Sequence, residues 1–316
     1  MYIQKGINIY MGIVVIGATM VDIKGYPDCQ YIPGGRNAGK IVQVHGGVSR
    51  NIAEDIANVE LKPTFVTALD NGPLSTDVIN KLKRHHVNTD YTVICENGLG
   101  TWLAVFDNDG DVTAAISSRP DLSGIGDLLD EKGDEIISKA DSVTVEIDMD
   151  SSIVKKILKL AEKHKKKVYA VVSNMSIAIE RRDLVQKTDC FVCNDDEAGL
   201  FFSDNYSDKT PEELAEIIST KIKAAKIKRM VVTMGGKGAV YAEENGNYGV
   251  CPPVPVAVID TTGAGDAFFS GVTIGMTYGK SLADSCRIGA RLASSVISNK
   301  ENVCPRFLPE EFGLNV

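Results

Sequence analysis

Short apolar segments alternate with segments of helical periodicity along most of this chain. The apolar segments have the length of strands, and the segments between them repeat apolar residues three and four positions apart, as amphipathic helices do. The predicted strands are residues 12–17, 65–68, 142–147, 167–172, 190–193 and 230–233, and the predicted helices are residues 51–59, 74–85, 152–166, 212–224 and 267–278. This alternation predicts an α/β fold in three layers, with a mainly parallel central sheet between helices.

Two stretches, about 22–45 and 91–117, interrupt the alternation with extended, turn-rich sequence. The second contains Asn108-Asp109-Gly110 between two alternating runs, a strong signal for a hairpin. We expect both stretches to supply strands of a small β-sheet that projects from the main sheet as a lid. Since no linker divides the chain, residues 1–316 are predicted to form a single domain.

Charge and apolar content exclude several classes of partner. The 316 residues carry a formal charge of −8, which argues against the basic surface of a nucleic-acid binder. No apolar run is long enough for a membrane span, and the N-terminus lacks the pattern of a secretory signal. Together with an odd number of cysteines, seven, this predicts a cytoplasmic protein that acts on a small molecule rather than on nucleic acid or membrane.

The most informative segment is 260–266 (DTTGAGD), which leads into an apolar helix. Gly263 and Gly265 let a ligand approach the main chain, and the start of a helix favours a phosphate. Asp266 in the first turn can accept a proton from an attacking hydroxyl, a weak-base role that a loose phosphoryl-transfer transition state tolerates. A plain helix cap is the alternative. Two aspartates that frame Gly-x-Gly exceed what a cap needs, so the pattern favours function.

Four motifs resemble the PfkB, or ribokinase-like, carbohydrate kinases. Residues 260–271 resemble the C-terminal signature of that family, and 46–53 (GGVSRNIA) resemble its N-terminal signature. Between them, 194–197 (NDDE) match its Asn-x-x-Glu element and 233–238 (TMGGKG) match its Thr-x-Gly-x-x-Gly element. The motifs follow the family's order across nearly the full chain. The resemblance implies a ribokinase-like fold and ATP-dependent transfer of the γ-phosphoryl group to the primary hydroxyl of a sugar or nucleoside.

The resemblance also implies roles for individual residues. Asp266 would be the catalytic base, beside an anion hole made by the amides of Gly263, Ala264 and Gly265. The residues expected to line the nucleotide site are Thr233, Gly235, Gly238 and Asn194. Glu197, with Asn194, would help to hold Mg²⁺, partly through water. Asp260 and the carbonyl group of Thr262 would hold a monovalent cation such as K⁺.

The acceptor site is expected at the motif of residues 46–53, where glycines let a sugar lie against the main chain. The residues predicted to bind the acceptor are Asp22, Gly46, Gly47, Arg50, Asn51 and Glu146. Asp22 can accept hydrogen bonds from two hydroxyls, and Asn51 offers both a donor and an acceptor. Taken alone, Asp22 reads as a solvated loop carboxylate, and Glu146 reads equally well as a surface carboxylate at a strand end.

The identity of the acceptor rests on Val48 and Arg50. Sugar kinases of the family often have lysine where this chain has Val48, and residues 46–54 with 37–40 (NAGK) look like the pseudouridine kinase branch. Arg50 could meet a base carbonyl, or it could point to solvent. The first expectation is therefore phosphorylation of pseudouridine to pseudouridine 5'-phosphate.

Two other functions are alternatives to pseudouridine phosphorylation. Ribokinase or another carbohydrate kinase is the first alternative, and a non-catalytic sugar- or nucleoside-binding protein on the same fold is the second. A Rossmann oxidoreductase and a P-loop kinase are disfavoured because neither Gly-x-Gly-x-x-Gly after the first strand nor a Walker motif is present. Exposed lid strands often pair between subunits, so a homodimer through the lid is a further prediction.

Overall fold

The main sheet has eight strands in the order β14-β13-β12-β11-β10-β9-β1-β4. The structure is a computed structural model, and it describes residues 11–314, so the predicted domain limits at 1 and 316 lie outside the described residues. Neighbouring strands are parallel except at one edge, where β13 runs antiparallel to both β12 and β14. The strands are β1 Ile13–Ile16, β4 Thr64–Val66, β9 Ser142–Glu146, β10 Lys167–Val171, β11 Cys190–Asn194, β12 Arg229–Thr233, β13 Ala239–Glu243 and β14 Tyr248–Cys251.

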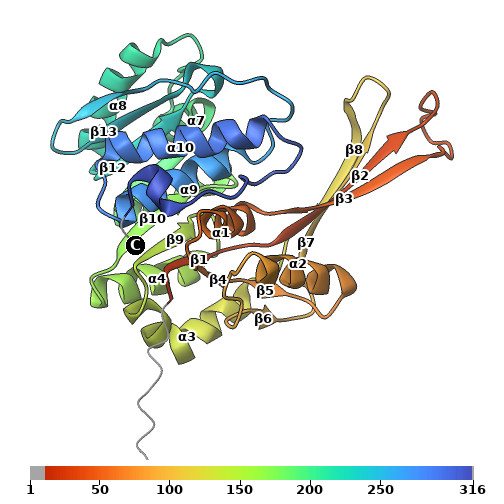
Figure 1. Cartoon of the computed structure of the whole chain (residues 1–316), viewed down its shortest axis with the longest axis horizontal. Coiled ribbons are helices and arrows are strands. Elements are labelled where there is room, and N and C mark those ends of the chain that lie inside the picture. Colours follow the sequence, from red (N-terminus) through yellow and green to blue (C-terminus); the bar gives the residue numbers. More distant parts are fainter. Residues whose placement is uncertain (1–10, 315–316) are drawn as a thin grey trace, which may run out of the picture.

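Helices cover both faces of this sheet, which confirms the predicted three layers (Figure 1). Alternate residues of a strand face opposite sides: Val14 and Ile16 join one apolar core, and Ile13 and Val15 join the other. The first core is covered by α3 Ser123–Ser138, α4 Ser151–Lys163, α5 Met175–Ala178, α6 Arg182–Val185, α7 Asp195–Phe202 and α8 Pro211–Ala225. The second is covered by α1 Val48–Asn58, α2 Pro73–Arg84, α9 Ala264–Thr277 and α10 Leu282–Ile297. Three short 3-10 turns also lie within the described residues: η1 Ile179–Arg181, η2 Gly235–Lys237 and η3 Pro309–Phe312.

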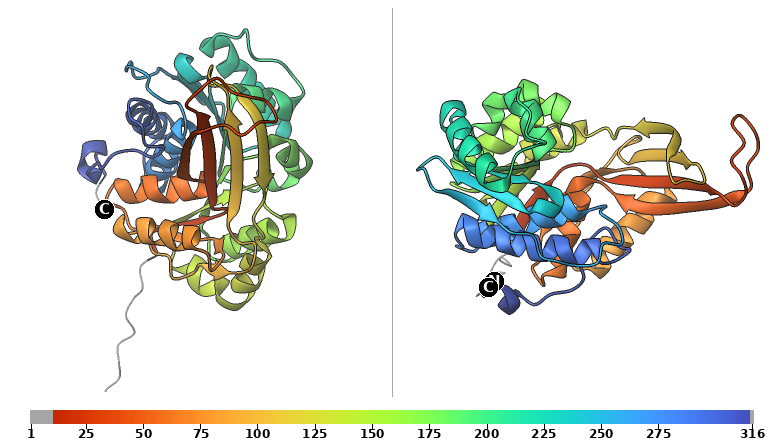
Figure 2. Two further views of the ribbon diagram at one scale, coloured as in Figure 1. Left: turned by 90° about the vertical axis from the view of Figure 1, so that its right-hand side faces the viewer. Right: turned by 90° about the horizontal axis from the view of Figure 1, so that it is seen from above.

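A second, four-stranded sheet projects from this body, as Figures 1 and 2 show. Its order is β3-β2-β7-β8. The strands are β2 Met20–Pro27, β3 Gly39–Gly46, β7 Gly100–Phe106 and β8 Val112–Ser118, close to the stretches expected to form a lid. We call it the projecting sheet. Its outer face exposes Ile41, Leu103 and Ile116, and pairing of two copies through this sheet stays a prediction.

The segment 91–95 differs from the sequence-based expectation. Instead of joining the projecting sheet, β6 Val93–Ile94 pairs in parallel with β5 Ala68–Leu69. The amide of Val93 donates to the carbonyl oxygen of Thr67 at 2.8 Å, and the amide of Cys95 donates to that of Leu69 at 2.9 Å. These bonds tie the segment to the end of β4, so it extends the body of the molecule.

Helix α9 is held in place by an unusually close crossing with α10. A Cβ atom added at Gly271 would lie 2.4 Å from the amide nitrogen of Gly289, so glycine is required where the helices meet. The crossing and the surrounding apolar core fix the direction of α9, and with it the position of its first turn. No helix within residues 11–314 combines the length and apolar character needed to cross a membrane.

Candidate active site

The carboxyl ends of the parallel strands meet at one edge of the main sheet, where ligands bind in open α/β sheets. Strand β9 ends at Glu146, β11 at Asn194 and β12 at Thr233. Asn194 and Thr233 are register partners on neighbouring strands. The strand order therefore brings candidates for acceptor and nucleotide binding to the same edge from distant parts of the sequence.

Asp266 lies in the first turn of α9 and faces α1. Its Oδ2 atom accepts a hydrogen bond of 2.6 Å from Nδ2 of Asn51. Burial raises the pKa of Asp266 to about 6, although the Asn51 hydrogen bond and the charge of Arg50 act in the opposite direction. Such a carboxylate accepts a proton more readily than an ordinary aspartate and is still largely ionised at neutral pH.

The turn before α9 has a backbone that only glycine fits well. Gly263 is the N-cap residue with φ of 83°, and a Cβ atom there would lie 2.0 Å from the carbonyl oxygen of Asn302. The free amides and positive end of the helix dipole favour an anion here. The amide of Ala264, however, already donates to the carbonyl oxygen of Thr261 at 3.2 Å. Of the three amides predicted to form the anion hole, this one has a partner inside its own turn.

A cavity of about 870 Å³ adjoins Asp266 and is lined by most of the predicted acceptor residues. The predicted residues in its lining are Asp22, Gly46, Gly47, Asn51 and Glu146. Burial raises the pKa of Asp22. Glu146 is only 3% exposed and accepts a 2.9 Å hydrogen bond from the amide of Ser49. Burial, together with repulsion from Asp148, raises the pKa of Glu146 to about 7, so the interpretation of Glu146 as a surface carboxylate was wrong.

Arg50 is the predicted acceptor residue that the structure places outside the cavity. Its side chain is 0% exposed and is absent from the lining of the cavity, so it meets neither a base carbonyl nor solvent. The guanidinium instead pairs with the buried carboxylate of Glu54, one helical turn along α1. The guanidinium lies on the side of α1 that faces the main chain of β3, where it donates to the carbonyl oxygens of His45 and Gly46.

The nucleotide candidates lie at the ends of β11 and β12. Asn194 and Glu197 form a capping box at the start of α7, with amide-to-side-chain hydrogen bonds of 2.8 Å in both directions. Burial, followed by repulsion from Asp148, raises the pKa of Glu197. Gly235 and Gly238 have φ of 52° and 94° in the turn after β12. Residues 194–197 thus have a structural role as the cap of α7. Residues 233–238 form a turn that places main-chain atoms rather than side chains beside the end of β12.

Asp260 and Thr262, predicted to hold a monovalent cation, bond to each other. The amide of Thr262 donates to Oδ1 of Asp260 at 2.8 Å, and this bond lowers the pKa of Asp260. The pair shapes the turn ahead of Gly263, and its role toward a cation stays a prediction.

Comparison with known proteins identifies the family. A model of the pfkB family carbohydrate kinases matches residues 12–304. The chain belongs to this family. It is therefore a phosphotransferase with an alcohol acceptor, a kinase of carbohydrates or nucleosides.

Two relatives and one solved structure show the range within the family. The guanosine-inosine kinase of Exiguobacterium acetylicum is 30% identical over 292 residues, 92% of this chain and 95% of that protein. The pseudouridine kinase of Escherichia coli K12 is 26% identical over 290 residues, 90% of each chain. The structure of Arabidopsis thaliana ribokinase with ribose and ATP superposes with a TM-score of 0.82 at 21% identity, covering 97% of this chain and all of that one. The last likeness confirms the ribokinase-like fold.

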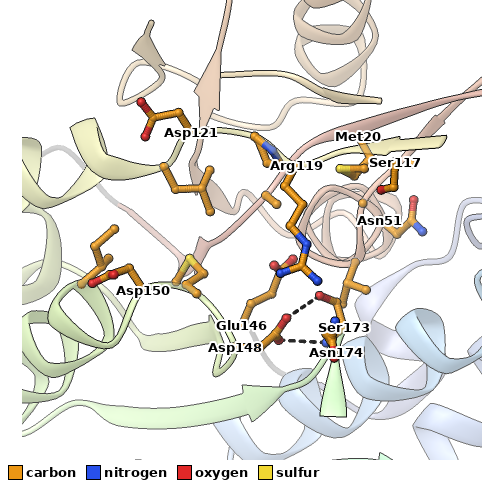
Figure 3. A pocket seen from close by; sticks show the side chains of 18 of the residues that line it. Met20, Asn51, Ser117, Arg119, Asp121, Glu146, Asp148, Asp150, Ser173 and Asn174 are labelled. Carbon is orange, nitrogen blue, oxygen red and sulfur yellow. Dashed lines mark hydrogen bonds between the residues drawn. The ribbon is translucent and has the colours of Figure 1, made fainter. Parts of the chain in front are cut away.

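The cavity of this PfkB-family kinase also contains residues that the sequence did not single out. They are Arg119, Asp148, Ser173, Asn174 and Asn302. Asp148 accepts hydrogen bonds from the amide and hydroxyl of Ser173, at 2.9 and 2.7 Å, and the Arg119 side chain reaches toward Asp148 and Glu146 (Figure 3). Arg119 follows β8 directly, in a loop whose sequence carries no motif, so only its place after a lid strand could have drawn attention to it.

The acidic residues of the site suit a metal ion whose other ligands are waters and the phosphates of the substrate. Within residues 11–314, no group of three or more His, Cys, Asp or Glu residues could hold a metal ion by itself. Mg²⁺ in kinases is commonly bound by one or two carboxylates, waters and the substrate phosphates. Glu197 fits that requirement because only one of its carboxylate oxygens is used in the capping box.

Proposed function

We propose that this kinase uses ATP to phosphorylate the primary hydroxyl of a nucleoside, with Asp266 as the base. The observation that carries the proposal is the position of Asp266 between the helix start at Gly263 and a cavity of about 870 Å³. A cavity of that size lies within the range of about 300–1,000 Å³ that is typical of pockets for small molecules, and it has room for a sugar with an attached base.

In this proposal each part of the site has one task. Asp22 and Asn51 hold sugar hydroxyls, and Asp266 takes the proton from the attacking oxygen. The free amides at the start of α9 stabilise charge on the transferred group. Mg²⁺, when bound near Glu197, supplies charge neutralisation for the phosphates. Closure of the projecting sheet would exclude water and protect ATP from hydrolysis.

Arg119 supports an acceptor whose base carries a carbonyl group. It makes no ion pair or hydrogen bond with the described part of the chain, so its donors are available to a ligand. Guanidinium groups pair well with O6 and N7 of guanine-type bases. Guanosine and inosine are the first candidates, because the relative at 30% identity is named for them. Pseudouridine is the second: it also has carbonyl groups, although Arg50 no longer supports it.

The proposal predicts a ranking of acceptors. With purified protein, ATP and Mg²⁺, kcat/KM for guanosine, inosine or pseudouridine should exceed that for ribose or adenosine by about tenfold or more. ADP release measured against this panel checks the ranking. Activity on ribose with none on nucleosides would support the ribokinase alternative, and binding of a nucleoside without ADP release would support the non-catalytic one.

Arg119→Met should lower kcat/KM for the preferred nucleoside by about 10- to 100-fold, the cost of losing a charge-assisted hydrogen bond. Activity on ribose, which has no base, should change little. Lys156→Met is the matched control, because Lys156 lines the same cavity but already donates to the carbonyl oxygen of Gly126 at 3.1 Å. An equal loss for nucleoside and ribose would remove Arg119 from base recognition.

A further inference from the structure

Arg50 is a fully buried arginine directly beneath the candidate active site. Besides pairing with Glu54, it donates to the carbonyl oxygens of His45 and Gly46, the latter at 3.4 Å. Burying two charges costs much of what their attraction returns, so a buried ion pair is weak evidence for stability alone. The buried pair of Arg50 and Glu54 therefore needs an explanation other than stability.

Nη2 of Arg50, which also donates to the carbonyl oxygen of His45, fixes the side-chain amide of Asn51. Nη2 of Arg50 donates to Oδ1 of Asn51, and Nδ2 of Asn302 donates to the same oxygen at 3.3 Å. A guanidinium has no acceptor, so only the oxygen of the amide can face it. The amide nitrogen must then point the other way, where it meets Oδ2 of Asp266 at 2.6 Å.

Three further contacts hold this arrangement, two made by Asn302 on one side and one made by Lys81 on the other. Nδ2 of Asn302 also donates to the carbonyl oxygen of His45 at 2.8 Å, and Oδ1 of Asn302 accepts from Arg50 at 3.3 Å. On the far side, Glu54 pairs with Lys81 at 3.2 Å, near the surface. A continuous series of polar contacts therefore runs from Lys81 on α2 to Asp266 on α9.

The charges around Asp266 make Arg50 important electrostatically as well. The ionisable groups that act on Asp266 are Arg50 and Asp55 from α1 and Glu197 from α7. Arg50 is the one cation among these, and it lowers the pKa of Asp266, whereas Glu197 raises it. Asp55 is itself buried, with a pKa raised to about 8, and accepts a 2.7 Å hydrogen bond from the amide of Cys304.

We propose that Arg50, held by Glu54, is a positioning residue that orients the Asn51 amide and thereby holds the Asp266 carboxylate in place for proton transfer. The inference rests on the proposed role of Asp266 as the base. Arg50 touches neither the acceptor nor the nucleotide and acts through Asn51. Lys81 and Glu54 extend the same support to the surface of α2.

The double variant Arg50→Met, Glu54→Gln tests this without leaving an unpaired buried charge. We expect kcat to fall about tenfold or more, and the acceptor KM to rise by a smaller factor because Asn51 also holds a sugar hydroxyl. The midpoint of the acidic limb of the kcat profile should move to a higher pH than in the wild type, because a cation that favours the ionised form of Asp266 is lost. The matched control is Arg229→Met, Glu243→Gln, which removes a part-buried pair of 2.9 Å at the opposite edge of the main sheet.

A readout without turnover separates this inference from the proposed function. The ¹³C carboxyl resonance of Asp266, followed by NMR against pH, should show the same upward shift of its pKa in the double variant. If the wild type phosphorylates nothing, the proposed function fails but the NMR titration still tests the contact. Unchanged titration of Asp266, or an equal fall of kcat in both double variants without a shifted midpoint, would overturn the positioning role.

Discussion

Asp266→Asn is expected to lower kcat by about 10²- to 10⁴-fold, the usual contribution of a general base. The fold should survive, because the amide oxygen of the new side chain can still accept the hydrogen bond from Asn51. Acceptor binding should stay within about threefold, since the change removes a proton acceptor and not a hydroxyl contact. Kinetics of ADP release and calorimetric titration with the acceptor measure the two effects separately.

The same variant should not lower the melting temperature at pH 7.5. Burial raises the pKa of Asp266 from 3.8 to about 6, so the folded chain binds this proton more tightly than the unfolded chain. Stability from this group is therefore present below pH 4 and is lost as the pH rises through 6, and an uncharged amide removes that loss. Asp284→Asn is the control: it alters a carboxylate in the first turn of α10, outside the cavity. Near-normal kcat in Asp266→Asn would show that another group is the base.

The layers of the fold could be predicted from the sequence because buried parallel strands are short and apolar on both faces. Strands β13 and β14 were missed, although Asn245-Gly246 between them is a hairpin signal. Helix α3 was missed for a different reason. Gly124, Gly126 and Gly133 lower its helix propensity, and its apolar contacts with α4 and the sheet compensate.

The candidate site could be predicted from the sequence only at residues whose positions are fixed by the local shape of the backbone. Gly263 and Asp266 lie in a turn whose shape follows from its own residues, and the structure places them together at the cavity. The direction of Arg50 depends instead on Glu54, Asn302 and the main chain of β3, and no local pattern contains that information. Arg119 likewise reaches the cavity only because β8 pairs with β7 in the projecting sheet.

Gly263→Ala is expected to abolish measurable turnover and to destabilise the fold by more than about 2 kcal/mol. A positive φ costs a residue with a side chain about 1–2 kcal/mol, and the new Cβ would lie 2.0 Å from the carbonyl oxygen of Asn302. Either the turn or the segment around Asn302 must move. The first displaces the amides at the start of α9, and the second breaks the contacts of Asn302 with Asn51 and His45. Urea unfolding and ADP release measure the two losses.

Gly265→Ala is the matched comparison within the same turn. A Cβ atom at Gly265 meets nothing within 4 Å, its φ is not positive, and its amide is retained. The free energy of unfolding of Gly265→Ala should equal that of the wild type or exceed it by up to about 1 kcal/mol, since Ala favours a helix over Gly. Equal destabilisation by the two substitutions would mean that the turn tolerates no side chain anywhere. The special requirement at Gly263, and with it the argument that this turn is shaped to admit an anion at the start of α9, would then be lost.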